Sequence, residues 1–422
     1  MSHPSSRIGF VSTRLAGTDG VSLETEKWTE VLQDLGHECF FFAGECDRPA
    51  ERSRVVPEAH FEFSAVQEIN ADLFENYTRS AKTSEAIHEV WRILLRALRE
   101  FIDDFGLQLL IVENALSIPM NVPLAVALTE IIAETNIAVV AHHHDFAWER
   151  ERYAVNAAED YLRASFPPDM PTIRHVVINS FGASQLALRT GIRATLIPNV
   201  MDFDTPPSVP DEFCDDLRTT LGIGSDDVML LQPTRVVPRK RIERAIELAR
   251  WLDVPCGLVV THGSGDEGSD YKQYLEDYAK VLGVRVLFAE ERFAPQRGKA
   301  ADGQKTYALA DAYHHADLVT YPSRVEGFGN AFLETIYYRR PLVISRYEIF
   351  KTDIRPKGFQ VIGFDSYIDR HTVQRARDVL RSSDELRTIV EHNFALGRQH
   401  YSFAVLKDRL CALIDECREQ MM

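Results

Sequence analysis

Two carboxylates, Glu326 and Glu334, stand eight positions apart in a segment that also contains two glycines. Gly327 and Gly329 let the backbone come close to a bound molecule, because glycine has no Cβ atom. Asn330 is predicted to cap the next helix, so that the first amides of this helix face an anion or sugar hydroxyls. Two carboxylates at this spacing suit two hydroxyl-bearing parts of one ligand. A loop-to-helix corner with incidental surface acids fits the same residues, and the residues alone do not decide.

A basic segment, residues 233–242, also follows a predicted strand and precedes a predicted helix. Four of the seven residues from Arg235 onward are basic, although the formal net charge of the chain is −16. Arg235 and Lys240 suit a diphosphate, since arginine binds phosphate oxygens in pairs and lysine supplies a point charge. A solvated basic turn beside Glu243 and Glu247 is the alternative.

Three consecutive histidines, residues 142–144, end an apolar run. Adjacent residues of an extended segment point to alternate faces and rarely share one metal ion, so the sequence predicts no metal site here. We expect His143 or His144 to point into a ligand site as a hydrogen-bond donor, with Arg150 and Arg152 reaching an acceptor. Packed, hydrogen-bonded histidines are the alternative.

A fourth segment, residues 14–22, joins the first predicted strand to the first predicted helix. Gly17 and Gly20 permit positive φ and a close approach of the backbone. Glu24 and Glu26 suit the start of a helix, where the helix dipole favours negative charge. Many strand-to-helix turns are rich in glycine, so this pattern alone is weakly specific.

Short apolar runs alternate with longer helical patterns along the whole chain, which predicts α/β domains with parallel, doubly wound sheets. The expected strands are residues 7–12, 38–43, 109–113, 138–142, 175–179, 228–232, 257–262, 284–288, 318–321 and 342–345. The expected helices are residues 22–35, 84–105, 123–135, 181–189, 242–252, 271–282, 306–315, 331–338 and 402–416.

The chain has 422 residues, more than the roughly 250–300 at which one hydrophobic core stops growing, so we expect two domains. Residues 198–210 break any regular pattern and mark the seam. The first domain is placed at residues 1–203, joined by a C-terminal helix within 402–422, and the second at 204–401. The carboxyl ends of their strands are expected to surround one cleft.

Composition narrows the class of protein further. Hydrophobic residues make up 45% and charged residues 26%, as in ordinary globular enzymes, and the acidic balance argues against nucleic acid as a partner. No run of 18 apolar residues and no signal-peptide core are present, which disfavours membrane association. Six scattered cysteines without a CxxC pair indicate a reducing compartment, so the cytoplasm is expected. A monomer and a homo-oligomer both remain open.

Taken in order, the four segments resemble the family-four retaining glycosyltransferases, which adopt the GT-B fold of two Rossmann-like domains facing across a cleft. The E-x7-E motif of this family matches Glu326 and Glu334, with the typical Gly-Phe-Gly between them. Its Arg and Lys five positions apart match Arg235 and Lys240.

The N-terminal half is similar to the same family in looser form. The family's glycine loop matches residues 17–20 and its strand-end histidine falls within 142–144, while residues 197–202 look like its crossover between domains. Asp19 stands where a second glycine is common, which would narrow the approach to phosphate. His144 is chosen because a His-Asp pair is the commoner form in the family.

The resemblance implies a hexosyltransferase that moves a sugar from a nucleoside diphosphate sugar to an acceptor hydroxyl, with retention and without a cofactor or a metal for donor binding. It implies the catalytic residues Arg235, Lys240, Glu326 and His144. It implies donor-binding residues at Gly17, Gly20, Gly327, Phe328, Gly329, Asn330, Glu334, Glu291 and Arg292. Lys240 and Arg235 would hold the diphosphate, Glu334 the ribose and Glu326 the transferred sugar. The backbone near 290–293 is expected to contact the base, so side chains do not distinguish UDP, GDP and ADP.

The acceptor-side residues are expected to be Arg14, Asp145, Arg150 and Arg152. Three arginines suit a carboxylate or a phosphate, which predicts a small anionic acceptor such as a hydroxy acid or its glycoside.

A competing motif, residues 263–268, matches the G-x-G-x-x-G pattern of dinucleotide-binding turns, with Glu290 and Glu291 about 20 residues on. It makes an NAD(P)-dependent oxidoreductase the alternative, and a GT-B sugar-nucleotide epimerase is another. Asp266 and Glu267 would oppose a pyrophosphate, and the motif follows the second strand of its domain instead of the first, so the transferase explains more of the chain.

Overall fold

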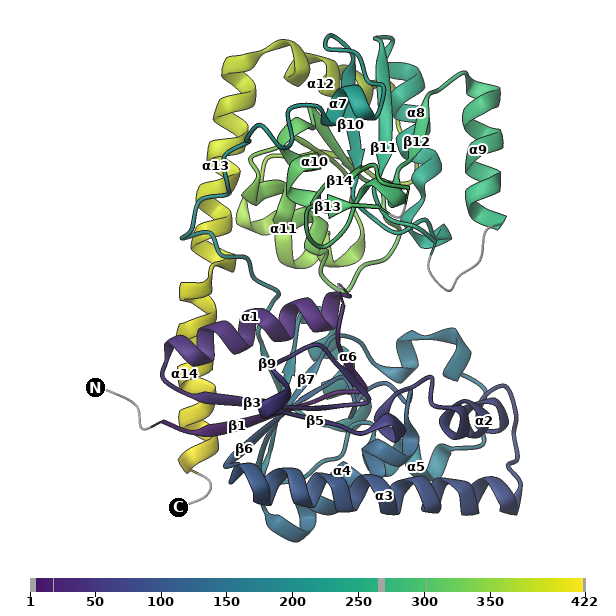
Figure 1. Cartoon of the computed structure of the whole chain (residues 1–422), viewed down its shortest axis with the longest axis vertical. Helices are drawn as coiled ribbons and strands as arrows, with labels where there is room; N and C mark the ends of the chain where they lie inside the picture. The colour runs from purple at the N-terminus through teal and green to yellow at the C-terminus, as the bar shows by residue number, and fades with distance from the viewer. Residues whose placement is uncertain (1–4, 18, 265–269, 301, 420–422) are drawn as a thin grey trace. The chain divides into compact units, whose positions relative to one another are not determined.

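The computed structural model describes residues 5–17, 19–264, 270–300 and 302–419 in two compact units (Figure 1). The first unit comprises Met1–Val200 and Phe403–Met422, and the second comprises Met201–Ser402. The boundaries predicted from the sequence lie up to three residues away from these. The candidate dinucleotide motif falls partly outside the described residues.

The first unit is built on a parallel sheet of seven strands in the order β5-β3-β1-β6-β7-β8-β9. The order reverses between β1 and β6, and ligands bind at the carboxyl ends of strands beside such a reversal. The strands are β1 (Arg7–Val11), β3 (Glu38–Ala43), β5 (Ser53–Val55), β6 (Leu109–Glu113), β7 (Ala138–His143), β8 (Ile173–Val177) and β9 (Ala194–Leu196).

Helices cover both faces of this sheet, because successive side chains of a strand point to opposite faces. Ile8 and Phe10 pack with α1 and α14, whereas Val11 packs with α3 and α4 on the opposite face (Figure 1). The helices are α1 (Gly20–Asp34), α2 (Ser64–Leu73), α3 (Ala81–Phe105), α4 (Val122–Thr135), α5 (Glu159–Ser165), α6 (Ser180–Thr190) and α14 (Phe403–Glu419).

The long helix α3 shows how local sequence sets these elements. Ser80 caps it by accepting a hydrogen bond from the amide of Thr83, and Gly106 ends it with a φ of 58° that glycine adopts without strain. Apolar residues repeat every three or four positions between these ends and form the buried stripe. This stripe consists of Ile87, Val90, Leu94, Leu98, Phe101 and Ile102.

The second unit holds a parallel sheet of six strands in the order β12-β11-β10-β15-β16-β17, with its reversal between β10 and β15. The strands are β10 (Val228–Gln232), β11 (Cys256–Val260), β12 (Val286–Phe288), β15 (Leu318–Tyr321), β16 (Leu342–Ser345) and β17 (Ile362–Phe364). The helices are α7 (Leu217–Thr220), α8 (Ile242–Leu252), α9 (Asp270–Leu282), α10 (Leu309–His315), α11 (Asn330–Tyr337), α12 (Arg370–Arg381) and α13 (Ser383–Tyr401).

Several elements were missed or misplaced by the sequence analysis. Three edge strands, β5, β9 and β17, have only three residues each, too few to show a periodic pattern. Helices α2, α5, α7, α12 and α13 were not predicted. The helix expected at 306–315 begins at Leu309, because Lys305 and Thr306 pair with β13 (Gly298–Lys299) as the short strand β14.

A buried pair of neutral histidines makes the stability of the first unit depend on pH. His143 of β7 and His175 of β8 are both buried, and their Nε2 and Nδ1 atoms lie 2.9 Å apart. Burial lowers the pKa of His175 to about 4 and that of His143 well below its ordinary value. The unfolded chain, with a histidine pKa near 6.5, therefore binds protons that the folded chain does not bind as pH falls from about 6.5 to 4.

We expect the titration of His175 alone to lower the free energy of unfolding by about 2 kcal/mol between pH 8 and pH 5. His175→Asn, which has no titrating ring, should reduce the difference in melting temperature between these two pH values in calorimetry of the full chain. An equal pH dependence in the variant and the parent chain would contradict this assignment.

Candidate active site

The carboxyl ends of β10 and β15 are neighbours, so the loops that follow these strands come together. Thr320 of β15 donates a hydrogen bond of 2.8 Å to the side chain of Gln232 at the end of β10, and both residues are buried. Beyond the strands, the amide of Arg324 donates to the carbonyl of Arg239 at 2.8 Å. These bonds join the basic segment to the segment that carries the two carboxylates.

Lys240 and Glu326 form a buried ion pair where these loops meet. The Lys240 ammonium donates to Glu326 Oε1, both side chains are 10% exposed, and Arg239 lies 3.5 Å from the other carboxylate oxygen. Burial raises the pKa of Glu326, but the charges of Lys240 and Arg239 outweigh it and hold this pKa below its ordinary value. Burial lowers the pKa of Lys240 despite the carboxylate. The ammonium also lies 5.2 Å above the ring of Tyr321.

Arg235 is exposed at the same corner and has no ion-pair partner among the described residues. Its charge, like that of Lys240, helps burial to lower the pKa of His262, which places the three basic groups near one another. His262 was not among the residues predicted from the sequence. The signal lay in its position, two residues beyond β11, the strand beside β10. This corner can hold a small polyanion.

Gly329 is required by the packing of the loop before α11. Its φ is 112°, and a Cβ atom there would lie 2.7 Å from the hydroxyl of Tyr347 and 3.0 Å from the ring of Tyr321. Tyr347 also donates 2.7 Å to the carbonyl of Phe328, which is buried. The prediction that Asn330 caps the helix was wrong. Gly329 occupies the cap and Asn330 is the first helical residue, because only glycine fits this backbone between the tyrosines.

Glu334 lies partly buried on α11 and belongs to a different cluster from Glu326. The hydroxyl of Tyr313 donates to Glu334 Oε2 at 2.8 Å, and the ring of Tyr313 stacks on Tyr338 with centroids 4.8 Å apart. Burial raises the pKa of Tyr313, and the adjacent carboxylate raises it further. The tyrosine therefore stays protonated and fixes the orientation of the carboxylate.

Glu291 and Arg292 lie in a short 3-10 helix, Glu290–Arg292, after the edge strand β12. Arg292 pairs with Asp302 at 2.9 Å, and Glu291 is exposed. No hydrogen bond or ion pair of the described residues links these two side chains to Lys240 or Glu326. At the first glycine of the candidate dinucleotide motif, Gly263, an added Cβ atom would collide with the carboxylate of Glu290.

In the first unit, Asp19 lies in the glycine loop after β1 and caps the helix that follows. Its carboxylate caps α1 by accepting from the amides of Val21 and Ser22 at 3.0 and 3.2 Å, and Arg14 donates to it at 3.2 Å. Gly17 is exposed with a φ of 77°, and Gly20 is the first residue of α1. An aspartate at this position therefore serves the helix start, where an anionic ligand would have to compete with it.

The three histidines divide between the two faces of β7. His142 Nδ1 lies 2.9 Å and His144 Nε2 3.2 Å from Glu113 Oε2, whereas His143 contacts His175 on the opposite face. Ligand atoms of Glu113, His142 and His144 lie within 4.8 Å of one another. Both rings already bond to the carboxylate, so we interpret the group as a hydrogen-bonded cluster and not as metal ligands. Glu113 was not among the residues predicted from the sequence.

Of the proposed acceptor residues, only Arg150 and Asp145 contact each other through a hydrogen bond or ion pair among the described residues. Arg150 Nε donates to Asp145 Oδ2 at 2.6 Å, and Arg14 is paired with Asp19. Arg152 is exposed and its guanidinium lies 4.6 Å from the ring of Tyr153. No hydrogen bond or ion pair among the described residues connects the three arginines. Within the described residues, Arg152 makes no ion pair with a carboxylate.

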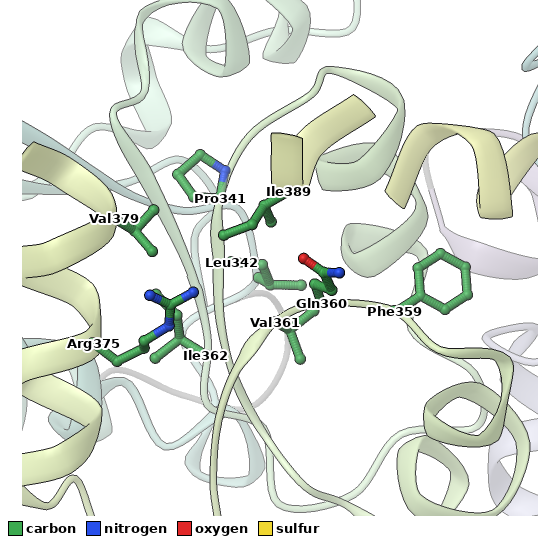
Figure 2. Close-up of a pocket in the computed structure, with 9 residues that line it drawn as sticks. All are labelled: Pro341, Leu342, Phe359, Gln360, Val361, Ile362, Arg375, Val379 and Ile389. Atoms are coloured by element: carbon green, nitrogen blue, oxygen red, sulfur yellow. The ribbon is translucent and has the colours of Figure 1, made fainter. Parts of the chain in front are cut away.

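A cavity of about 290 Å³ in the second unit lies apart from the candidate site residues (Figure 2). It opens between the edge of the sheet at β16 and β17 and the helices α12 and α13, and none of the candidate site residues lines it. Its lining is Pro341, Leu342, Phe359, Gln360, Val361, Ile362, Arg375, Val379 and Ile389. The mostly apolar lining does not suit a polyanion.

The described helices include none that combines the length and the apolar character needed to cross a membrane. No protein-family model matches the chain.

Two curated proteins are similar to this chain over most of their length. The mannosylglucosylglycerate synthase of Thermotoga maritima is 31% identical over 438 residues, which cover 96% of this chain and 98% of that protein. The mannosylglucosylglycerate synthase of Petrotoga mobilis is 32% identical over 393 residues, covering 85% and 86%.

Solved structures show the same fold at low sequence identity. A glycosyltransferase from Rickettsia africae has a TM-score of 0.70 at 13% identity and covers 98% of this chain and 99% of its own. HepE of Anabaena, solved in complex with UDP and glucose, has a TM-score of 0.66 at 14% identity and covers 97% and 100%. The predicted GT-B fold is thereby confirmed.

The buried Lys240–Glu326 pair makes a prediction about stability. Lys240→Met should lower the free energy of unfolding by about 3 kcal/mol, because it leaves a buried carboxylate without its ammonium. The double variant Lys240→Met/Glu326→Gln should recover at least half of this loss. Calorimetry of the full chain measures both, and a double variant no more stable than the single one would contradict the pairing.

Proposed function

Because the chain belongs to the family-four retaining glycosyltransferases, we propose that it transfers a mannosyl group from a nucleoside diphosphate mannose to glucosylglycerate. The product would be mannosylglucosylglycerate, which the names of the two similar synthases specify. The single observation that carries this proposal is 31% identity to one of them over 96% of the chain. Glucosylglycerate is a small glycoside with one carboxylate, in keeping with the anionic acceptor expected from the arginines.

The donor diphosphate is proposed to bind at the corner of Arg235 and Lys240. Arg235 is exposed without a carboxylate partner among the described residues, so its charge is available to an anion. Lys240 is held by Glu326, and a diphosphate oxygen would share the ammonium with that carboxylate. Glu326 would then bind hydroxyls of the mannosyl group while it keeps Lys240 in place.

The reaction breaks the bond between the anomeric carbon and the diphosphate oxygen, and the electron pair leaves with the diphosphate. Arg235, Lys240 and the first amides of α11 are proposed to stabilise this charge. The acceptor hydroxyl forms the new bond on the same face of the sugar, and its proton passes to a donor phosphate oxygen. The α configuration is retained, and no protein base is needed.

The remaining donor contacts follow the same scheme. Glu334, oriented by Tyr313, is proposed to accept hydrogen bonds from the ribose hydroxyls. The loop Gly327–Asn330 would orient the sugar through its backbone. The backbone at Glu291 and Arg292 would contact the base.

On the acceptor side, Arg152 is the strongest candidate for the glycerate carboxylate. Arg14 and Arg150 are each paired with an aspartate, Asp19 and Asp145, whereas Arg152 makes no ion pair among the described residues. A ligand carboxylate at Arg152 would displace no acidic partner, so it retains more of its electrostatic gain. The paired arginines are proposed to bind acceptor hydroxyls.

We also propose a cytoplasmic location. All six cysteines are free thiols in the structure, as expected in a reducing compartment. Nucleoside diphosphate sugars and a small acid are proposed as the only substrates, with no nucleic acid partner.

The activity is tested with the full chain, glucosylglycerate, and GDP-, UDP- or ADP-mannose in separate reactions. We expect mass spectrometry to find mannosylglucosylglycerate with one of the three donors, and proton NMR to show an α-mannosidic linkage. Glucosylglycerol, which lacks the carboxylate, serves as the matched acceptor and should be used far less well. Absence of transfer with all three donors would overturn the proposal, and equal use of glucosylglycerol would overturn the carboxylate assignment.

Arg235→Ala and Lys240→Ala should each lower turnover about 100-fold or more, because each removes a charge that stabilises the departing diphosphate. Arg250→Ala is the matched control, since Arg250 is an exposed arginine near the end of α8. We expect near-normal turnover for it in the same assay. Near-normal rates for Arg235→Ala and Lys240→Ala would contradict the diphosphate site.

A further inference from the structure

A buried cluster of one carboxylate and two imidazoles lies at the carboxyl ends of β6 and β7. The side chain of Glu113 is fully buried, that of His142 is 1% exposed, and that of His144 is 10% exposed. A carboxylate inside a protein is costly unless charged or hydrogen-bonding partners surround it. The cluster therefore requires an explanation that the proposed catalytic steps do not supply.

Strand pairing brings the three residues together. Glu113 and His142 are direct partners in the parallel register of β6 and β7, so their side chains leave the sheet on the same face. His144 is two positions after His142 and returns to that face, whereas His143 points to the other face. The backbone of His144 is held as well, because its amide donates to the Asn114 side chain at 2.8 Å.

The hydrogen bonds assign different nitrogens of the two rings to the carboxylate. His142 bonds through Nδ1 and His144 through Nε2, both to Glu113. The second nitrogen of His142 is buried without a partner among the described residues, and the indole of Trp28 stacks on this ring at 4.3 Å. The second nitrogen of His144, Nδ1, also has no partner among the described residues, and its ring is the most exposed of the three.

We propose that Glu113 is a positioning residue that holds His144 through Nε2 and leaves Nδ1 as the ring atom that hydrogen-bonds to the donor sugar. The role toward the sugar rests on the proposed function, whereas the state of the ring does not. A carboxylate that fixes one nitrogen of an imidazole sets its orientation and decides which nitrogen carries the proton. His142 supplies a second hydrogen bond to the same carboxylate through its Nδ1.

The charges around the ring agree with this arrangement. Burial alone would raise the pKa of Glu113, but the two imidazoles lower it to about 2. Burial lowers the pKa of His144, and the bond to Glu113 outweighs it and leaves this pKa above its ordinary value, with Glu24 of α1 and Asp145 contributing. Below that pKa, Nδ1 carries a proton and donates, and above it Nδ1 only accepts.

The proposal predicts two properties of the ring that NMR of histidine-labelled full chain measures directly. The signals of His144, assigned by their loss in His144→Gln, should titrate above pH 6.5, and the neutral ring should carry its proton on Nε2. These measurements need no variant of Glu113. A neutral ring protonated on Nδ1, or a pKa at or below 6.5, would overturn the proposal.

Glu113→Gln keeps the size of the side chain and removes its charge, so it should lower the pKa of His144 and reduce kcat about 10-fold or more, with less effect on the donor KM. Asp311→Asn is the matched control, because Asp311 is a fully buried carboxylate that pairs with Arg297 in the second unit. It should lower the melting temperature without moving the pKa of His144. An unchanged His144 pKa in Glu113→Gln would overturn the proposal. So would a metal role for the cluster, shown if mass spectrometry finds one zinc ion per purified parent chain and none in Glu113→Gln. A chain with the predicted ring state and no mannosyl transfer would instead refute the proposed function alone.

Discussion

Buried parallel strands can place polar side chains only where the strands end, and this constraint governs both units. Within the strands, apolar side chains fill the space between the sheet and the helices on its two faces. Lys240 and Glu326 follow neighbouring strands of the second sheet, and Glu113 and the histidines end neighbouring strands of the first. In each unit the chemistry gathers beside the reversal of strand order, because there two adjacent loops leave in different directions.

The candidate site groups largely neutralise one another in the structure. Lys240 is matched by Glu326, Arg150 by Asp145 and Arg14 by Asp19. Arg235 and Arg152 are the two proposed site arginines outside this pattern of ion pairs among the described residues. Such pairing keeps long side chains in place at little cost in reorganisation, and it leaves a few unpaired charges to attract an anionic ligand.

Sequence alone predicted the features that depend on local pattern. The alternation of short apolar runs with longer helical periods predicted the two parallel sheets. The spacing of Arg235, Lys240, Glu326 and Glu334 predicted the segments that are proposed to bind the donor. Contacts between residues that are far apart in the sequence could not be predicted from such patterns. Glu113 contacts His142 because of a strand register, and His262 approaches Lys240 because β11 lies beside β10. The cap at Gly329 depended on two tyrosines, Tyr321 and Tyr347, that no local pattern places against it.

The last helix has a consequence for how the chain is made. Leu406, Leu410 and Leu413 of α14 complete the core under one face of the first sheet, against Ile8, Phe10 and Trp28. These leucines follow the second unit in the sequence, so nascent chains expose that face during the whole synthesis of the second unit. The second unit is continuous in sequence and can finish folding first. A chain terminated before α14 would thus lack part of the core of the first unit, although most of that unit precedes the second unit in the sequence.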